Sequence, residues 1–330
     1  MHSISHLCEA DLRGTLRSED DFLRLVDAYF PRYSRHFPQG RGHDCAELEN
    51  LPASLALSTD MFLEGSHFSR AYFTPAEAAA KALTAAVSDL AASGARPLGF
   101  SLGIAMPGGM PVRTAEEIVR GMAEKAEEYG IGLTGGDVAR SRELGFSLCV
   151  WGEGAGHGFL RRGGALPGDR VFLVGSVGLA RAGLFFLEAC GREAMGQWPL
   201  CAAAHLAPRA LVEEGRRIAA FCHAMKACDA EGGGRISLMD LSDGLARDLP
   251  RLLGSAGMEL DITALRLPEE LEKASAVMGR PAEDISLSGG EDYAPLGLSP
   301  EAVMPRLCSA APGLGFTCGH TERPGIPGNG

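Results

Sequence analysis

Apolar residues in the first half of the chain follow two spacings. Alternation at every second position predicts strands, and recurrence at every third or fourth position predicts amphipathic helices. The alternating segments are "SLALSTD", "PLGFSLGIAMP", "IGLTGGD" and "GFSLCVWGEG". A short helix is predicted over 20–30, and longer ones over 74–94 and 114–130. Both longer helices open with the Thr-x-x-Glu pattern of a capping box and close at a glycine.

The second half of the chain shows the same two apolar spacings, after a glycine-rich stretch, "GHGFLRRGGALPGD". Strands are predicted at "RVFLVG", "RISLMD", "MELDI" and "DISLS", with helices over 179–189, from about 208 to 222, and after "RISLMD". Ser242 is expected to be the N-cap of that last helix, with Asp243 in its first turn. Strands and helices do not alternate strictly, which favours an α+β fold with mixed or antiparallel sheets. We place the domain boundary between 153 and 154, giving domains 1–153 and 154–330.

Composition narrows the functional classes. The net charge of −11 argues against a nucleic-acid binder but leaves phosphate ligands possible, since carboxylates hold phosphates through divalent cations. The most apolar long window, 171–190, is interrupted by glycines and an arginine, so no membrane association is expected. The nine cysteines are scattered without a C-x-x-C pair. Their pattern favours a reducing compartment, and we expect a cytoplasmic protein.

Carboxylates recur beside small residues, in strand ends, glycine turns and one alanine-rich helix. They are Asp44, Asp60, Asp89, Asp137, Asp240, Asp243, Glu291 and Asp292. Each motif alone has an ordinary interpretation, because "SDG" is usually a helix cap and "GGD" is usually a turn. Asp89 is the exception, since its apolar neighbours would make an unpaired carboxylate costly. Together the acids indicate a site for several Mg²⁺ ions that hold phosphates, although the chain has no G-x-x-x-x-G-K-[ST] loop.

Six ordered motifs resemble one known family. "STDMFLEGSHF", "SDLAASGARPLGFSLGIAMP", "LTGGDVARS", "RRGGALPGD", "LMDLSDGLARDL" and "LSGGEDY" are similar to thiamine-monophosphate kinase, a member of the aminoimidazole ribonucleotide synthetase superfamily. The resemblance implies that fold, with two α+β domains: an N-terminal one that binds ATP and Mg²⁺ and dimerises through its sheet, and a C-terminal one that completes the active site. It also implies transfer of the γ-phosphoryl group of ATP to thiamine monophosphate by a homodimer.

The resemblance also implies roles for individual residues. Metal-binding positions are Asp44, Ser58, Thr59, Asp60, Asp89, Asp137, Asp240 and Asp243. Nucleotide-contacting positions are Gly136, Asp137, Arg162 and Ser242, and substrate-side positions are His67 and Glu291. No general base is implied, because an acceptor phosphate oxygen is already an anion.

Three features depart from the family pattern. His43 stands where an aspartate is usual, Pro295 follows "GGEDY" and suggests an edge strand or a bulge, and the usual C-terminal aromatic residue is missing. Two alternatives therefore stand beside the kinase: a superfamily relative that uses ATP on another acceptor, and a non-catalytic nucleotide-binding protein.

Overall fold

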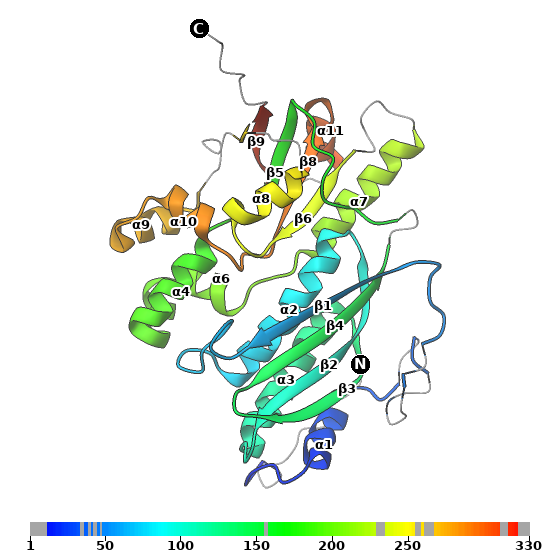
Figure 1. Cartoon of the computed structure of the whole chain (residues 1–330), viewed down its shortest axis with the longest axis vertical. Helices are drawn as coiled ribbons and strands as arrows, with labels where there is room; N and C mark the ends of the chain where they lie inside the picture. The colour runs from blue at the N-terminus through cyan, green and yellow to red at the C-terminus, as the bar shows by residue number, and fades with distance from the viewer. Residues whose placement is uncertain are drawn as a thin grey trace. The chain divides into compact units, whose positions relative to one another are not determined.

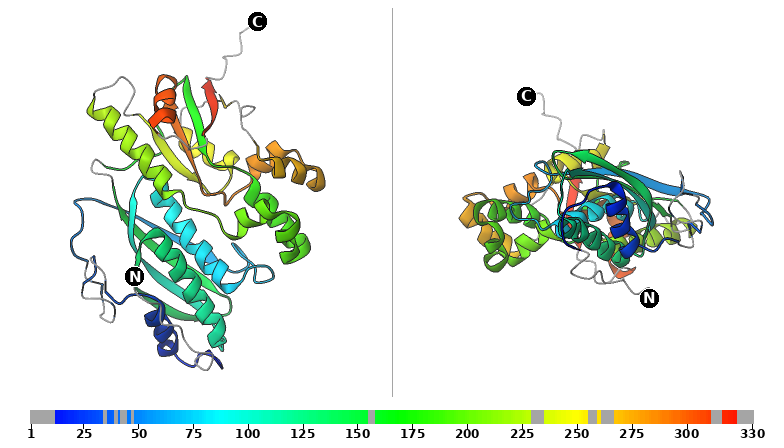
Figure 2. Two further views of the ribbon diagram at one scale, coloured as in Figure 1. Left: turned by 180° about the vertical axis from the view of Figure 1, so that it is seen from behind. Right: turned by 90° about the horizontal axis from the view of Figure 1, so that it is seen from below.

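The computed structural model describes residues 12–33, 36–38, 41, 45–46, 48–154, 158–228, 235–254, 259–260, 267–310 and 316–322. The chain forms two compact units (Figures 1 and 2). The first unit comprises Met1–Leu90 and Pro97–Glu153, and the second comprises Ala91–Arg96 and Gly154–Gly330. Among the described residues, no helix combines the length and the apolar character that a bilayer crossing needs.

The first unit is a four-stranded mixed sheet with helices on one face. The sheet order is β1-β4-β2-β3, where β1 and β4 are antiparallel and β2 and β3 are parallel. The strands are β1 (Leu55–Leu63), β2 (Arg96–Pro107), β3 (Gly132–Ser141) and β4 (Gly145–Glu153). The helices are α1 (Glu19–Tyr29), α2 (Pro75–Ala92) and α3 (Val112–Tyr129). Helices α2 and α3 lie behind the sheet in Figure 1 and in front of it in the reverse view of Figure 2.

One of the two predicted capping boxes forms. The Thr74 amide donates to the Glu77 carboxylate at 2.8 Å, and the Glu77 amide donates to the Thr74 hydroxyl at 3.2 Å. The second box, at Thr114, was wrong, because α3 begins two residues earlier, at Val112, with Pro111 as its N-cap. Proline pre-sets a backbone angle near the helical value, so it can stand at a helix start without a side-chain cap.

Two strands continue beyond their predicted ends. Strand β1 continues past Asp60 to Leu63, because Phe62 keeps the alternation and packs into the core with 3 % of its surface exposed. Strand β3 continues past Asp137, because its parallel pairing with β2 extends to Ser141. The predicted strand end at Asp60 and the predicted glycine turn before Asp137 are therefore wrong, and both carboxylates lie within a sheet.

The second unit is built on a five-stranded antiparallel sheet in the order β6-β8-β5-β9-β7. Its strands are β5 (Asp169–Val174), β6 (Ser237–Leu241), β7 (Glu259–Leu260), β8 (Ala294–Pro300) and β9 (Phe316–Glu322). Its α-helices are α4 (Leu179–Cys190), α5 (Ala194–Gln197), α6 (Pro199–Leu206), α7 (Val212–Ala227), α8 (Leu245–Leu253), α9 (Glu269–Met278), α10 (Ala282–Ser288) and α11 (Met304–Ala310). The described residues of this unit also include the single-turn 3₁₀ helices η1 (Gly191–Glu193) and η3 (Glu301–Val303).

Both faces of this sheet are covered. Val171 and Leu173 pack with Leu252 of α8, whereas Phe172 and Val174 pack with Ile218 of α7. Successive residues of a strand point to opposite faces, so the continuous apolar run of β5 is the expected pattern for a strand with helices on both sides.

Three expectations for this unit were wrong. "DISLS" lies in helix α10, where Pro281 precedes the helix and acidic residues occupy the first turn. Helix α7 begins at Val212 rather than near 208, after the unpredicted helices α5 and α6. Strand β8 is interior rather than an edge, and Pro295 is tolerated as its second residue because the ladder with β5 begins only at Leu296.

Candidate functional site

In the first unit, Ser58, Asp60 and Asp89 gather where β1 packs against α2. The Ser58 hydroxyl donates a hydrogen bond to the Asp89 carboxylate. Burial and then the negative charge of Asp89 raise the pKa of Asp60, and His67 partly opposes this shift. Two carboxylates that repel one another in a half-buried place are a suitable environment for a cation, because a cation relieves the repulsion.

His67 lies just after β1, is exposed, and is near enough to Asp60 to act on its charge. Its Nδ1 accepts a hydrogen bond of 3.1 Å from the Leu63 amide, and its ring lies 5.5 Å from that of Phe62, centroid to centroid. The backbone bond fixes Nδ1 as the acceptor, so the neutral ring carries its proton on Nε2.

Thr59 and Asp137 share the opposite face of the sheet. Thr59 alternates with Ser58 and Asp60 along β1, so its side chain points away from α2. Neighbouring strands carry this face from Asp137 to Thr59. Asp137 pairs with Gly103 of β2, and a Cβ at Gly103 would lie 3.5 Å from the Cβ of Ser147 in β4. Ser147 pairs with Met61 of β1, which is on the same face as Thr59, two residues away. Strands β1 and β3 are the two edges of the sheet, about 14 Å apart at ordinary strand spacing. The acids of this unit thus form two groups.

Gly136 is required by the sheet itself. A Cβ at this position would lie 1.8 Å from the Leu102 carbonyl oxygen of β2. No side chain fits there without moving the backbone, so a structural reason for glycine exists whether or not a ligand binds nearby.

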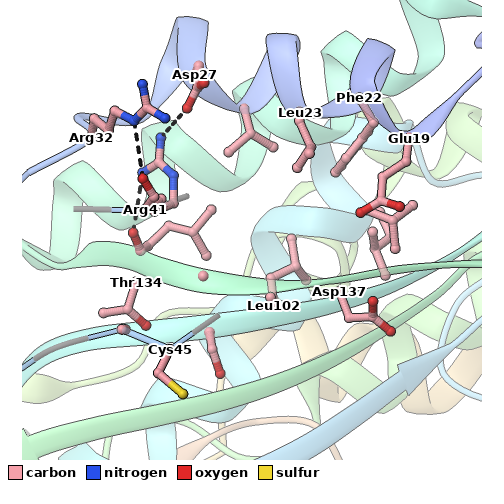
Figure 3. Close-up of a pocket in the computed structure, with 18 residues that line it drawn as sticks. Glu19, Phe22, Leu23, Asp27, Arg32, Arg41, Cys45, Leu102, Thr134 and Asp137 are labelled. Carbon is pink, nitrogen blue, oxygen red and sulfur yellow. Dashed lines mark hydrogen bonds and ion pairs between the residues drawn. The ribbon is translucent and has the colours of Figure 1, made fainter. Parts of the chain in front are cut away.

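A cavity of about 460 Å³ lies beside Gly136 and Asp137, between α1 and strands β2 and β3. Phe22 and Leu23 of α1 point toward Leu102 across it (Figure 3). The remaining lining residues are Glu19, Val26, Asp27, Arg32, Arg41, Cys45, Ala46, Ser101, Ile104, Leu133, Thr134, Gly135 and Val138. An apolar wall with a few charged groups at one end is the usual composition of a small-molecule site.

Arg41 fixes one end of this cavity. Its guanidinium pairs with Asp27 at 2.9 Å (Figure 3). It also donates to the carbonyl oxygens of Phe30, Pro31 and Leu133. Arg41 thereby connects the end of α1 to β3. The next residues, Gly42, His43 and Asp44, lie outside the described residues, so the metal role of Asp44 stays a prediction.

In the second unit, the turn after β6 is held by an aspartate that the sequence analysis missed. Asp248 is fully buried, and its Oδ2 accepts the amides of Ser242 at 3.0 Å and Asp243 at 2.8 Å. Helix α8 begins at Leu245, after Gly244, so the prediction that Ser242 caps this helix was wrong. The carboxylate that binds the free amides comes from the first helical turn, and the acid of "ARDL" was the available signal.

Arg251 is a second missed residue. Its Nη1 lies 2.6 Å from Asp243 Oδ2 and 2.9 Å from Asp248 Oδ1. Because Arg251 and Asp243 are both about half exposed, at 49 % and 42 %, the pair is solvated and a competing cation can reach it. Asp240, two residues before Ser242 in β6, is 7 % exposed.

The loop that carries Glu291 packs directly against this turn. The Glu291 amide donates to the Ser242 carbonyl at 2.8 Å, and the Tyr293 amide donates to Leu241 at 2.8 Å. A Cβ at Gly290 would lie 2.6 Å from the Ser242 carbonyl oxygen, so only glycine permits this approach. Ser242, Asp243 and Glu291 are therefore brought together from separate parts of the sequence.

The two adjacent acids of this loop have different surroundings. The Asp292 carboxylate accepts the Gly178 amide at 2.9 Å and the Ala180 amide at 3.3 Å, at the start of α4. Asp292 is thus engaged by a helix N-terminus. Glu291 adopts a positive φ of 66° and keeps its side chain 24 % exposed.

Arg162 lies near the other end of β6. The neighbouring Arg161 carbonyl accepts the Leu238 amide at 3.1 Å, near the start of β6, whereas Ser242 follows its end. Arg162 lines a cavity of about 390 Å³ together with Arg161, Lys226 and Arg235. Arg235 is neutralised by a two-pronged ion pair with Asp169. The remaining cations make this cavity suited to an anion.

In the parts of the chain that the structure describes, no three His, Cys, Asp or Glu side chains converge closely enough to hold a metal ion unaided. The donor set nevertheless fits Mg²⁺, which prefers oxygen ligands, keeps several waters and takes further ligands from substrate phosphates. The raised pKa of Asp60 is the observation that supports this fit, because a nearby cation would stabilise its ionised form.

Comparison with known proteins gives consistent results. Residues 42–154 match the family described as AIR synthase related protein, N-terminal domain. The thiamine-monophosphate kinase of Corynebacterium glutamicum is 33 % identical over 259 residues, covering 76 % of this chain and 74 % of that protein. The thiamine-monophosphate kinase of Escherichia coli K12 is 32 % identical over 314 residues, covering 89 % and 88 %. A solved structure described as AaThiL complexed with AMPPCP and TMP has a TM-score of 0.70 at 30 % identity and covers 82 % of this chain and 81 % of that one.

Proposed function

Because this chain belongs to the thiamine-monophosphate kinase family, we propose that it transfers the γ-phosphoryl group of ATP to thiamine monophosphate with the help of several Mg²⁺ ions. AMPPCP is an ATP analogue whose terminal bridge is carbon, so a relative that holds it together with TMP has a site for each substrate. The observation in this chain that carries the proposal is the Ser58, Asp60 and Asp89 cluster, which pairs two mutually repelling carboxylates with a hydroxyl oxygen.

The proposed metal-holding residues include two groups, one of Asp60, Asp89 and Ser58 and one of Asp240 and Asp243. Thr59 and Asp137 lie at opposite edges of the other face of the sheet and are separate candidates, as is Asp44. Bound Mg²⁺ supplies positive charge that neutralises the phosphates and helps to hold donor and acceptor in line. Arg251 already contacts Asp243, so it keeps that carboxylate oriented and compensates its charge.

The reaction requires little acid–base catalysis from the protein. An oxygen of the acceptor phosphate attacks the γ-phosphorus while the bond to the bridging β–γ oxygen breaks, and ADP leaves. No side chain needs to remove a proton from the acceptor, since the attacking oxygen is ionised at neutral pH. The residues of this chain therefore bind, orient and neutralise. We assign nucleotide contacts to Gly136, Asp137, Arg162 and Ser242, and acceptor contacts to His67 and Glu291.

We also propose that the chain forms a homodimer through the sheet of the first unit. Leu55, Leu57 and Met61 of β1 are 37 %, 67 % and 59 % exposed, on the face opposite α2. An uncovered sheet face with large apolar side chains is typical of an interface. Thr59 and Asp137 share this face, so a second copy would lie beside predicted metal ligands.

We propose a cytoplasmic location on the basis of the cysteines. The seven cysteines whose side chains are described, from Cys45 to Cys308, are all free thiols. Free thiols at exposed positions such as Cys45 and Cys228 persist in a reducing compartment.

The decisive experiment is a Mg²⁺ and ATP assay of the purified protein with thiamine monophosphate, free thiamine and an aminoimidazole-pathway substrate in parallel. We expect thiamine diphosphate and ADP from the monophosphate alone. Asp243→Asn should abolish Mg²⁺-dependent turnover with little loss of fold, whereas Asp284→Asn, an exposed acid of α10, should not. ATP binding without product from any acceptor would refute the kinase proposal, and full activity of Asp243→Asn would refute the metal assignment.

A further inference from the structure

A buried histidine lies directly behind the carboxylate proposed to contact the acceptor. His205 belongs to the short helix α6, and its side chain is 2 % exposed. Its Nδ1 lies 3.3 Å from Oε2 of Glu291. At this distance the two groups form an ion pair when the imidazole is protonated.

The surroundings of His205 leave it little freedom. Helices α4 and α6 pack so closely that a Cβ at Gly183 would lie 2.0 Å from the Cys201 carbonyl oxygen and 3.0 Å from the Cβ of His205. Gly183 therefore permits the approach of α4 to α6, and the imidazole is confined between elements that cannot separate without losing core contacts.

Glu291 is restrained on its backbone side as well. Its amide is bonded to the Ser242 carbonyl, and the flanking Asp292 accepts two amides at the start of α4. With both the loop and the imidazole fixed, the carboxylate meets His205 through Oε2, while the Glu291 side chain as a whole remains 24 % exposed. A carboxylate held in this way presents its exposed part to a ligand in a single orientation.

We infer that His205 is a positioning residue for Glu291 and thereby for the acceptor substrate rather than for the nucleotide. The ligand group suited to the exposed part is a hydrogen-bond donor or a cation, and thiamine phosphates carry both, as an aminopyrimidine and a thiazolium ring. This inference rests on the proposed function, because it takes Glu291 as an acceptor contact. His205 does not itself touch the substrate or take part in phosphoryl transfer.

The test separates acceptor binding from nucleotide binding. His205→Leu removes the imidazole, and we expect the KM for thiamine monophosphate to rise about tenfold while the KM for ATP changes less than about twofold. His205→Asn places an amide N–H near the position of Nδ1, and it should restore most of the affinity. Cys201→Ala, at a fully buried residue of the same helix, controls for general repacking of α6.

A double-mutant cycle tests whether the effect passes through Glu291. If it does, His205→Leu adds little to the change caused by Glu291→Gln. The inference would be overturned if the two substitutions raised the KM for thiamine monophosphate independently, so that their effects multiplied. It would also be overturned if His205→Leu raised the KM values for ATP and thiamine monophosphate equally, or if Cys201→Ala behaved like His205→Leu.

A further measurement keeps this inference distinct from the proposed function. The ¹⁵N chemical shifts of His205 should change in Glu291→Gln, whatever substrate the protein uses. Unchanged shifts would refute the contact. If the shifts change in Glu291→Gln but the wild-type protein does not phosphorylate thiamine monophosphate, the contact stands. The proposed acceptor and the role of His205 in binding it would then both be refuted.

Discussion

Replacement of Asp248 by alanine should unfold the second unit more readily and disable the turn that carries Ser242 and Asp243. Asp248 is fully buried, and its carboxylate accepts two backbone amides at 3.0 and 2.8 Å. Alanine leaves both amides without this acceptor. It also leaves Arg251 with one carboxylate partner, Asp243, instead of two.

The size of the effect follows from these contacts. A hydrogen bond to a charged group contributes about 1.5 kcal/mol or more, so the two amide bonds give a loss of about 3 kcal/mol in the free energy of unfolding. The bond to Arg251 adds little, because Arg251 is 49 % exposed and its ion pairs are solvated. For a unit of this size, the loss corresponds to a fall in Tm of about 6–12 °C.

Thermal and urea denaturation measure this loss, and Mg²⁺ titration of ATP turnover measures the damage to the turn. Asp248→Asn keeps one acceptor oxygen and should lose about half as much stability. Asp284→Asn, also an acid in the first turn of a helix but exposed, should change stability by less than about 0.5 kcal/mol. An Asp248→Ala variant within 0.5 kcal/mol of wild type would refute the claim that this carboxylate holds the turn.

Three further predictions concern the first unit. Asp60→Asn should stabilise the metal-free form of this unit but abolish Mg²⁺-dependent activity. Because the pKa of Asp60 is raised in the folded state, ionising this carboxyl costs stability as pH rises from 3.8 through the folded pKa. Urea denaturation should therefore show the gain at pH 7 and none below pH 3.8. Tyr29→Phe removes a hydroxyl that donates to Glu116, and it should lower the free energy of unfolding by about 1 kcal/mol at pH 7. Burial and Glu116 raise the pKa of Tyr29 to about 12, so denaturation curves should show this difference shrinking between pH 10 and pH 12. Leu57→Lys should shift the protein from dimer to monomer in analytical ultracentrifugation, whereas Val277→Lys, on an equally exposed apolar residue of α9, should leave the dimer intact.

Elements with strong local signals were predictable from the sequence. The α2 capping box, the strand at "GFSLCVWGEG" and the helix that begins at Leu179 all follow from periodicity and capping, which act within a few residues. "DISLS" misled because alternation over five residues also fits a short helix, and Pro281 was the better signal. Helices α5 and α6 were missed because their short apolar segments owe their form to packing with α4.

The residues of the candidate site remain a prediction from sequence motifs, and their arrangement could not be derived from the sequence. The acids could be selected by their motifs, whereas the separation of Asp60 from Asp137 depends on the strand order of the sheet. Likewise, Asp248 and His205 act through contacts across 5 and 86 positions of sequence, and only the fold brings them to the turn and to Glu291. The acid of "ARDL" gave a local hint of the role of Asp248, whereas no sequence pattern around His205 pointed to Glu291.

The close approaches at Gly136 and Gly290 have a consequence for how this chain would change if its activity were no longer selected. The fold itself requires glycine at both positions, since a side chain at either would collide with a backbone carbonyl oxygen. The carboxylates of Asp60 and Asp89 repel one another and destabilise the metal-free fold, so replacing either of them would increase its stability. A decaying descendant would therefore discard these acids first and keep the glycine motifs. Among relatives, the Asp60 and Asp89 pair is the better diagnostic of a working enzyme, and "GGD" or "GGED" glycines alone would mark only inherited architecture.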